Sequence, residues 1–292
     1  MQKTDFVLSR LEKSRLKPGM LDDPGFGVIF SDHMFSMEYS GGRWHTPSIE
    51  PYADIQVSPA NTTLHYGQAV FEGMKAFRTS GGAVNIFRAD KYFERFVGSC
   101  KRLCIPEPDK DVFMTAVTEL VRLDAAWVPE NKGQSLYIRP FIFATGYNLG
   151  VKVSDSYRFM IITSPVGAYY KEGMNPVRLA TPGQYVRAAK GGLGAVKTPA
   201  NYAASLYAGE QARRDGFTQV LWLDAAEHRY VEEVGAMNVF FYFEDELATP
   251  ALDGTLLSGV TRDCVLKLAS EMGIRAVERR ISIEEVFAVT TA

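Results

Sequence analysis

The chain has 292 residues, and its composition and charge already narrow what it can be. Hydrophobic residues make up 46% and charged residues 23%, which is typical of a globular protein and excludes a disordered or fibrous chain. The 32 Lys and Arg residues nearly balance the 34 Asp and Glu residues, so the basic footprint of a nucleic-acid-binding protein is absent. At about 150 residues per domain, the length predicts two domains.

The sequence shows no membrane, secretory or metal-binding signal. Its longest apolar stretch, residues 234–243, is interrupted by Asn238 and is shorter than the roughly 18 residues that suggest a membrane span. The first five residues precede no apolar run, which argues against a secretory signal. The three cysteines form no C-x-x-C pair and predict reduced thiols rather than a disulfide or zinc framework. We therefore expect a cytoplasmic protein without a metal.

The first half of the chain has the pattern of an α+β unit with an antiparallel opening. Runs of β-branched and aromatic residues predict strands, and apolar residues at helical spacing predict two helices. The expected elements of the first part are strands at 27–30 and 33–39, a hairpin turn at 40–42 before Arg43-Trp44, and a strand at 83–87. They are followed by a helix that Asp90 can cap and that runs through Val97, a helix at 111–123, and strands at 136–145 and 159–163.

The two domains are expected to join in the segment 164–173, which carries glycines and a proline between periodic segments. We assign a small N-terminal domain to residues 1–165, the linker to 166–175 and the large domain to 176–292. The elements expected beyond the linker are a helix at 201–215 ended by Gly216, a strand at 219–223, a second strand at 239–243 and a helix at 261–272 closed by Gly273.

Lys197 is the first candidate for chemistry. The segment 191–198 looks like a phosphate-binding G-x-x-x-x-G-K-[ST] loop, but that pattern needs a glycine directly before the lysine, where this chain has Val196. A lysine in a loop is ordinarily solvated. Lys197, however, lies between a glycine-rich approach and the helix start at Asn201, where close backbone packing can desolvate its amine. A desolvated lysine has a lowered pKa and becomes a nucleophile toward carbonyl groups.

Two neighbouring glutamates form the second candidate. Alternation along a strand sends Glu232 and Glu233 to opposite faces. Glu233 precedes Val234 and Gly235 and suits a buried position, which requires a cationic partner, whereas Glu232 is expected to be a solvated surface carboxylate. Ordinary surface charge for both glutamates stays open as the alternative.

The third candidate is the glycine turn at Gly259, which enters an amphipathic helix at Val260 and Thr261. Free backbone N–H groups at a helix start can bind an anion, although many such helix starts hold only water. Together, the amine, the carboxylate and the anion site suit a cofactor with an aldehyde, a ring nitrogen and a phosphate. Pyridoxal phosphate has all three.

Ordered motifs along the chain carry a family resemblance. They are Phe30-Ser31-Asp32-His33-Met34, Leu64-His65-Tyr66, residues 71–77, Tyr137-Ile138-Arg139-Pro140, Lys197-x-x-x-Asn201-Tyr202, residues 219–224, Glu233-Val234-Gly235-x-Met237-Asn238 and Gly259-Val260-Thr261-Arg262. From about Gly25 to the last residue, the chain resembles the branched-chain-amino-acid aminotransferases, which are fold-type-IV pyridoxal phosphate enzymes. The resemblance implies a two-domain α+β or α/β fold, with a small N-terminal α+β domain and a larger C-terminal domain that has a barrel-like sheet.

The resemblance also implies a set of cofactor-binding residues. Lys197 would be the catalytic lysine that forms the Schiff base with pyridoxal 5'-phosphate, and Glu233 would face the pyridine nitrogen. Tyr202 would bond the phenolic oxygen of the cofactor. The phosphate would be held by Arg95 together with the backbone of Val260 and Thr261.

A further set is implied for the substrate. It comprises Phe30, Tyr66, Phe71, Tyr137, Arg139, Thr291 and Ala292. For the aromatic residues, plain core packing is the ordinary alternative. The chain also departs from the family: Thr290 stands where relatives have a glycine after the strand that 286–288 resembles, and family chains continue past this point. We therefore expect that a C-terminal segment is missing from the sequence.

The expected function is transamination. The amino group of leucine, isoleucine or valine would pass to 2-oxoglutarate at an active site between the domains. The resemblance implies a homodimer whose partner loop, near Leu149-Gly150-Val151, helps to close the pocket. A D-amino-acid transaminase or an aminodeoxychorismate-type lyase of the same fold is the nearest alternative. A non-catalytic binding protein is another, but it would be expected to lack Lys197.

Overall fold

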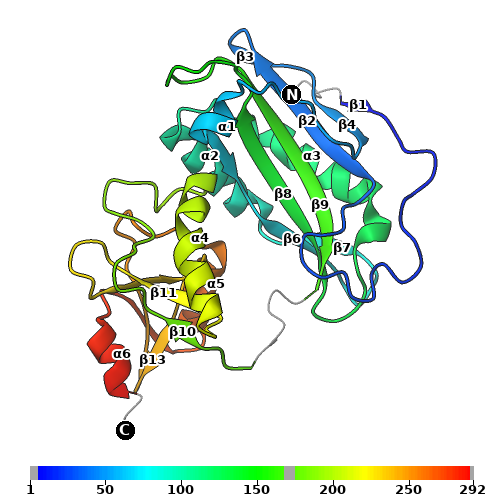
Figure 1. Cartoon of the computed structure of the whole chain (residues 1–292). Helices are drawn as coiled ribbons and strands as arrows, with labels where there is room; N and C mark the ends of the chain where they lie inside the picture. Colours follow the sequence, from blue (N-terminus) through cyan, green and yellow to red (C-terminus); the bar gives the residue numbers. More distant parts are fainter. Residues whose placement is uncertain (1–5, 168–174, 290–292) are drawn as a thin grey trace. The chain divides into compact units, whose positions relative to one another are not determined.

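The computed structural model describes residues 6–167 and 175–289 (Figure 1). The chain divides into two compact units, Met1–Gly173 and Met174–Ala292, and each has its own hydrophobic clusters. Both units combine strands with helices, which confirms the mixed α+β class. Within this chain the first unit is the longer one, whereas the resemblance implied a small N-terminal domain.

A nine-stranded sheet is the frame of the first unit. Its strands are β1 (Val7–Leu8), β2 (His33–Ser40), β3 (Arg43–Trp44), β4 (Ser48–Pro51), β5 (Ala69–Phe71), β6 (Met74–Arg78), β7 (Val84–Ile86), β8 (Ser135–Ala144) and β9 (Tyr157–Val166). The main path runs β1-β4-β2-β9-β8-β6-β7, with β3 paired to β2 and β5 paired to β8. The sequence-predicted hairpin between β2 and β3 is confirmed, and both of its glycines, Gly41 and Gly42, adopt positive φ.

The long strands β8 and β9 place the candidate substrate residues. They pair antiparallel along their whole length, from Ser135 opposite Val166 to Ala144 opposite Tyr157. Because side chains alternate along a strand, Leu136 and Ile138 are fully buried in the core while the residues between and beyond them face the other side. Tyr137 and Arg139 therefore lie on one face of the sheet, as their spacing predicts.

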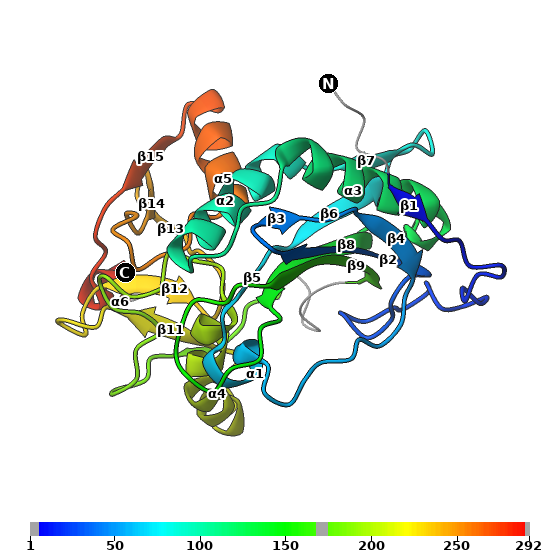
Figure 2. The same ribbon diagram turned by 90° about the horizontal axis from the view of Figure 1, so that it is seen from above.

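Helices cover the opposite face of this sheet (Figure 2). They are α2 (Ala89–Arg102) and α3 (Lys110–Leu123), followed by a 3-10 turn η1 (Ala125–Trp127), while the short α1 (Thr62–Tyr66) precedes β5. The carboxylate of Asp109 caps α3 by accepting the N–H groups of Asp111 and Val112. The buried face of α3 consists of Val112, Phe113, Ala116, Val117, Leu120 and Val121.

Three details of the first unit differ from the sequence-based predictions. Residues 27–30 form a turn and bends rather than a strand, because Gly27 adopts a φ of +70° that ends extended structure. Asp90 lies in the first turn of α2 and not at its N-cap, which is Arg88. Strand β9 continues to Val166, so the first residue of the segment assigned to the linker lies in the sheet. The boundary between the units falls within the segment 166–175.

The strands described in the second unit form two three-stranded sheets. Its strands are β10 (Leu179–Ala180), β11 (Gln219–Leu223), β12 (Val231–Val234), β13 (Phe241–Phe243), β14 (Glu246–Thr249) and β15 (Arg275–Glu278). The sheets are ordered β10-β11-β12 and β13-β14-β15. The helices are α4 (Pro199–Arg214), α5 (Val260–Glu271) and α6 (Ile283–Val289). The predicted strand at 219–223 and both predicted helices, at 201–215 and 261–272, are confirmed.

Two elements of this unit were predicted wrongly. The strand expected at 239–243 begins only at Phe241. Residues 286–288, which resemble a strand of the family, lie in α6 instead. The sequence Ser282-x-x-Glu285 is a capping-box pattern, and Ser282 Oγ accepts the N–H of Glu285 at 3.1 Å at the start of this helix. None of the helices within 6–167 and 175–289 has the length and apolar character that crossing a bilayer requires.

Candidate active site

Lys197 lies in the loop that leads into α4, beside the phenol of Tyr202. Its Nζ donates a hydrogen bond to Tyr202 Oη at 2.9 Å. The buried side chain of Asn201 orders this loop, because its Nδ2 donates to the carbonyls of Leu193 and Val196, each at 2.7 Å. The first turn of α4 thus fixes both the amine and the hydroxyl that contacts it.

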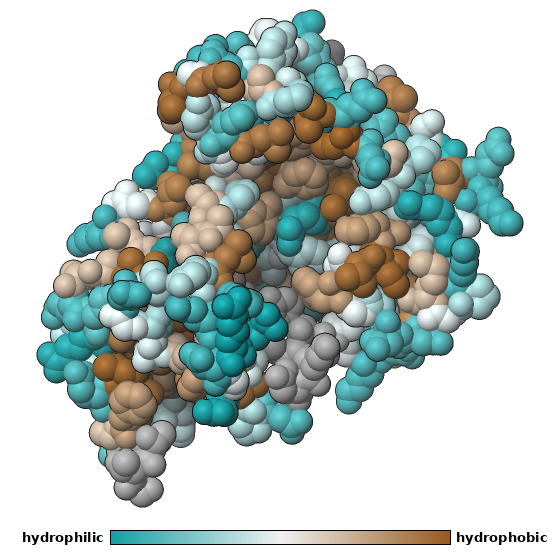
Figure 3. Space-filling view, in the orientation of Figure 1, coloured by the Kyte–Doolittle hydropathy of each residue, from teal (hydrophilic) through white to brown (hydrophobic). Residues whose placement is uncertain are grey.

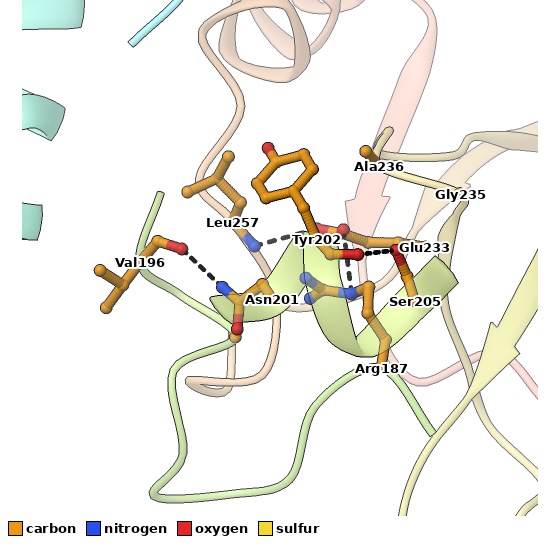
Figure 4. Close-up of a pocket in the computed structure, with 10 residues that line it drawn as sticks. Arg187, Val196, Asn201, Tyr202, Ser205, Glu233, Gly235, Ala236 and Leu257 are labelled. Atoms are coloured by element: carbon orange, nitrogen blue, oxygen red, sulfur yellow. Dashed lines mark hydrogen bonds and ion pairs between the residues drawn. The ribbon is translucent and has the colours of Figure 1, made fainter. Parts of the chain in front are cut away.

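Glu233 is buried in β12, as predicted, and its cationic partner is Arg187 (Figure 4). Only 2% of Glu233 is exposed, and Arg187 Nε lies 3.2 Å from its Oε2. The other oxygen, Oε1, accepts the N–H of Leu257 at 3.0 Å and that of Asn238 Nδ2 at 3.4 Å. Arg187 also donates to the carbonyl of Thr255. Backbone and side-chain donors therefore hold this carboxylate in one orientation.

The prediction that Glu232 is solvated is wrong. Only 5% of it is exposed, because all four residues of β12 are buried and both faces of the strand are covered. Burial raises the pKa of Glu232 to about 7, with Asp253 and Asp224 adding to the effect, while Thr255 and Arg187 oppose it. Alternation does separate the two glutamates, but it does not place either of them in water.

The start of α5 is built as predicted, with its first residue at Val260. Gly259 occupies the N-cap without a side-chain cap bond. A Cβ at Gly259 would lie 2.0 Å from Asn238 Oδ1, so only glycine fits there. Asn238 also donates to Leu257 O at 2.9 Å and thereby links this helix start to the carboxylate of Glu233. The first N–H groups of a helix can bind an anion.

In the first unit, Arg95 of α2 forms a bidentate ion pair with Glu72. Arg95 Nε and Nη2 donate to the two carboxylate oxygens of Glu72 at 2.7 and 2.8 Å. The Glu72 side chain is completely buried, and that of Arg95 is 13% exposed. A planar guanidinium held by two parallel hydrogen bonds has a fixed orientation.

An aromatic and cationic cluster lies on the β8 face of the same unit. Arg139 Nη2 donates to Tyr137 Oη at 2.9 Å, and its guanidinium carbon lies 4.7 Å from the centre of the Phe71 ring. Phe26 packs edge-on against Tyr137, with ring centres 5.4 Å apart. Three of the residues predicted for substrate binding, Phe71, Tyr137 and Arg139, are therefore brought together.

The other predicted substrate residues have different surroundings. Phe30 stacks on Tyr52, with ring centres 5.1 Å apart. Tyr66 donates its hydroxyl to the carbonyl of Leu149. Thr291 and Ala292 lie outside the described residues.

Sequence reasoning missed Arg187, Glu72 and Phe26 as members of these clusters. Glu72 stands inside the quoted motif at 71–77, so the motif itself was the available signal. Arg187 belongs to an irregular segment before α4, where no periodicity identifies which side chains turn inward. A buried carboxylate at Glu233 predicts some cation but does not say which one.

The residues of the second unit fit pyridoxal phosphate. The Lys197 amine donates a hydrogen bond to the Tyr202 phenol, and donors on several sides hold the buried Glu233 carboxylate. The start of α5, which has no side-chain cap, follows closely in sequence the loop whose Leu257 N–H contacts this carboxylate. Asn201, Tyr202, Glu233, Gly235 and Leu257 line one pocket (Figure 4). Gly235 has a φ of +57°, and a Cβ there would lie 2.3 Å from Gln219 Oε1. Glycine is therefore required at this position of the pocket wall.

Comparison with known proteins identifies the family. The family model for amino-transferase class IV matches residues 69–292. Branched-chain-amino-acid transaminase 1 of Bacillus subtilis (strain 168) is 52% identical over 268 residues, which are 91% of this chain and 75% of that protein. A branched-chain-amino-acid aminotransferase of Mycobacterium tuberculosis (strain ATCC 25618 / H37Rv) is 47% identical over 275 residues, covering 92% of this chain and 75% of the relative.

Solved structures agree. The branched-chain aminotransferase of Thermoproteus uzoniensis with norvaline has a TM-score of 0.73 at 27% identity, covering 88% of this chain and 81% of that one. A T.th. branched-chain amino acid aminotransferase complexed with N-(5'-phosphopyridoxyl)-L-glutamate has a TM-score of 0.69 at 26% identity, covering 85% and 78%. With more than half of its length matched by the family model, the chain belongs to the class IV aminotransferases.

Proposed function

We propose that this protein is a pyridoxal phosphate-dependent branched-chain-amino-acid transaminase, which moves the amino group of leucine, isoleucine or valine to 2-oxoglutarate. The observation that carries the proposal is the 2.9 Å contact between Lys197 and Tyr202, in a chain 52% identical to a branched-chain transaminase. We assign it to the cytoplasm. The domain bounds 1–165 and 176–292, with the linker at 166–175, are part of the proposal.

Lys197 is the catalytic residue in this proposal. When bound, the cofactor supplies an aldehyde that takes the amino group and a ring that withdraws electrons from the substrate α-carbon. Lys197 Nζ would hold the cofactor, and would then remove and return the α-proton. Tyr202 Oη, which accepts a hydrogen bond from this amine, would orient the amine and bond the phenolic oxygen of the cofactor.

Glu233 would stabilise a proton on the pyridine nitrogen. A carboxylate does so best when it is ionised and fixed, and the Arg187 guanidinium together with the N–H of Leu257 supports both conditions. The phosphate would be held by Arg95 and by the N–H groups of Val260 and Thr261 at the start of α5. Helix starts suit phosphate because their N–H groups and dipole favour an anion.

The cluster of Phe71, Tyr137 and Arg139 would give one pocket two kinds of contact. The aromatic faces can bury an aliphatic side chain, which is worth about 1.5–3 kcal/mol for a leucine-sized group. The guanidinium of Arg139 can bind the second carboxylate of glutamate or 2-oxoglutarate. Phe30, Tyr66, Thr291 and Ala292 complete the proposed substrate site on the strength of the family resemblance alone.

A homodimer is the proposed assembly. Apolar side chains of the loop between β8 and β9 are exposed, with Tyr147 at 78%, Leu149 at 69% and Val151 at 85%. Figure 3 shows that apolar side chains, in brown, reach the surface of the face drawn there. Exposed apolar side chains gathered on one loop favour contact with another protein surface. Sedimentation should give about twice the chain mass, and Leu149→Ser with Val151→Ser should shift the equilibrium toward monomer. A monomer in the unmodified protein would contradict this assignment.

The test of the function is a product assay with the full chain and added pyridoxal 5'-phosphate. L-leucine with 2-oxoglutarate should yield glutamate and the oxo acid of leucine in equal amounts. Lys197→Ala should abolish this turnover. Turnover of D-alanine but not L-leucine would assign the chain to the D-amino-acid transaminases, and pyruvate release from aminodeoxychorismate would assign it to the lyases. Cofactor binding without any turnover would make it a non-catalytic member of the fold.

A further inference from the structure

Glu72 is a buried acid that the proposed chemistry does not use. It follows β5 directly, and its backbone N–H donates to the carbonyl of Pro140 at 2.7 Å, which fixes the residue against β8. Its carboxylate is fully buried and accepts hydrogen bonds from Arg95 and from the N–H of Gly73, the latter at 3.0 Å. A carboxylate placed so deeply is tolerated because these donors replace water.

The geometry of this pair defines the orientation of Arg95. An arginine side chain has several rotatable bonds, and its guanidinium can bind an anion with more than one edge. Here the Nε–Nη2 edge is directed at Glu72, so the Nη1 edge faces away from it. The ring of Tyr92, 5.3 Å from the guanidinium carbon, gives a further contact. Ordering this side chain before an anion arrives removes an entropic cost from binding.

The same turn also adjoins the substrate cluster. A Cβ at Gly73 would lie 1.9 Å from Tyr137 Oη, the hydroxyl that accepts a hydrogen bond from Arg139. The backbone that carries Glu72 is therefore packed between the arginine proposed for the phosphate and the tyrosine proposed for the substrate wall. A displaced Glu72 would disturb both.

We propose that Glu72 is a positioning residue, which holds the guanidinium of Arg95 in the orientation that binds the phosphate of the cofactor. The inference rests on the proposed function, because it assumes that Arg95 meets this phosphate. If the ion pair between α2 and the residue after β5 were purely structural, Glu72→Gln would lower stability without changing the preference for the phosphorylated ligand. The proposal predicts a loss that depends on the phosphate group.

Comparing two ligands separates these cases. Pyridoxal 5'-phosphate and pyridoxal differ only in the phosphate, and each is titrated into the cofactor-free full-length protein while visible absorption is followed. The ratio of the two dissociation constants measures the contribution of the phosphate. It is insensitive to a fraction of unfolded protein, because that fraction lowers the number of sites equally for both ligands.

Glu72→Gln should weaken the binding of pyridoxal 5'-phosphate about 10- to 100-fold, as expected for disturbing a charge-assisted hydrogen bond, and should leave pyridoxal binding within about twofold. Glu72→Asp, which keeps the charge, should recover part of the ratio. The matched control is Glu94→Gln, because Glu94 is an exposed acid on α2 that pairs with Lys91. Its ratio should equal that of the unmodified protein.

A double variant tests whether Glu72 acts through Arg95. If it does, Glu72→Gln combined with Arg95→Gln should bind pyridoxal 5'-phosphate no more weakly than Arg95→Gln alone. An unchanged or increased ratio in Glu72→Gln, or additive losses in the double variant, would overturn the inference. An unmodified protein that binds neither ligand would instead overturn the proposed function, so the two failures are distinguishable.

Discussion

Replacing Glu232 with glutamine should make the protein more stable above neutral pH. Burial raises the pKa of this carboxyl from 4.5 to about 7, so the folded protein favours its neutral form. Stability from this group is complete below about pH 4.5 and is lost as the pH rises through 7. At about 1.4 kcal/mol for each pH unit, the loss is about 3 kcal/mol. Glutamine has nearly the same shape and cannot ionise, so Glu232→Gln should avoid it.

The assay is urea unfolding of both proteins at pH 5, 6, 7 and 8. The free energies of unfolding should be nearly equal at pH 5, and the variant should exceed the unmodified protein by up to about 3 kcal/mol at pH 8. Glu271→Gln is the control, because Glu271 is exposed and should give a difference that does not change with pH. A pH-independent difference for Glu232→Gln, or a variant that is less stable at pH 8, would refute the reasoning.

Two further substitutions test the roles assigned to charged residues. Glu233→Gln breaks the buried ion pair with Arg187, and losing one partner of such a pair costs about 3–5 kcal/mol. If this loss destabilises mainly the transition state, turnover should fall by about two to three orders of magnitude. A fall of less than about threefold in steady-state turnover would contradict that role. Arg139→Met keeps most of the volume and removes the charge, so single-turnover rates should fall by one to two orders of magnitude for glutamate, about 1.5–3 kcal/mol, and much less for leucine. Equal losses for both substrates would assign Arg139 to the shared α-carboxylate or to structure.

The sequence predicted helices and strands correctly where a single local feature determines the secondary structure. The helix at 111–123 has both a periodic apolar face and an aspartate that caps it, and it begins within one residue of the expected position. Residues 27–30 have strand-forming side chains, but the left-handed conformation of Gly27 turns the chain there. At α6 the family resemblance indicated a strand, whereas the capping pattern Ser282-x-x-Glu285, which is local to the sequence, indicates a helix start.

The candidate site was predictable where a residue type stands in a motif. Lys197, Tyr202 and Glu233 fall in motifs, and the structure surrounds each of them with polar partners. The surroundings themselves were not predictable, because they depend on contacts between segments distant in sequence. Alternation placed Glu232 and Glu233 on opposite faces of β12 but contained no information about what covers those faces.

The most direct test of the central claim is to locate the covalent attachment of the cofactor. The full chain is incubated with pyridoxal 5'-phosphate, reduced with borohydride, digested and analysed by mass spectrometry. We expect the pyridoxyl group on Lys197 and its disappearance in Lys197→Ala. Lys75 is the informative competitor, because burial lowers the pKa of its amine and thereby favours the neutral form that can attack a carbonyl. A pyridoxyl group on Lys75 or Lys190 in place of Lys197 would contradict the assignment of Lys197 as the catalytic residue.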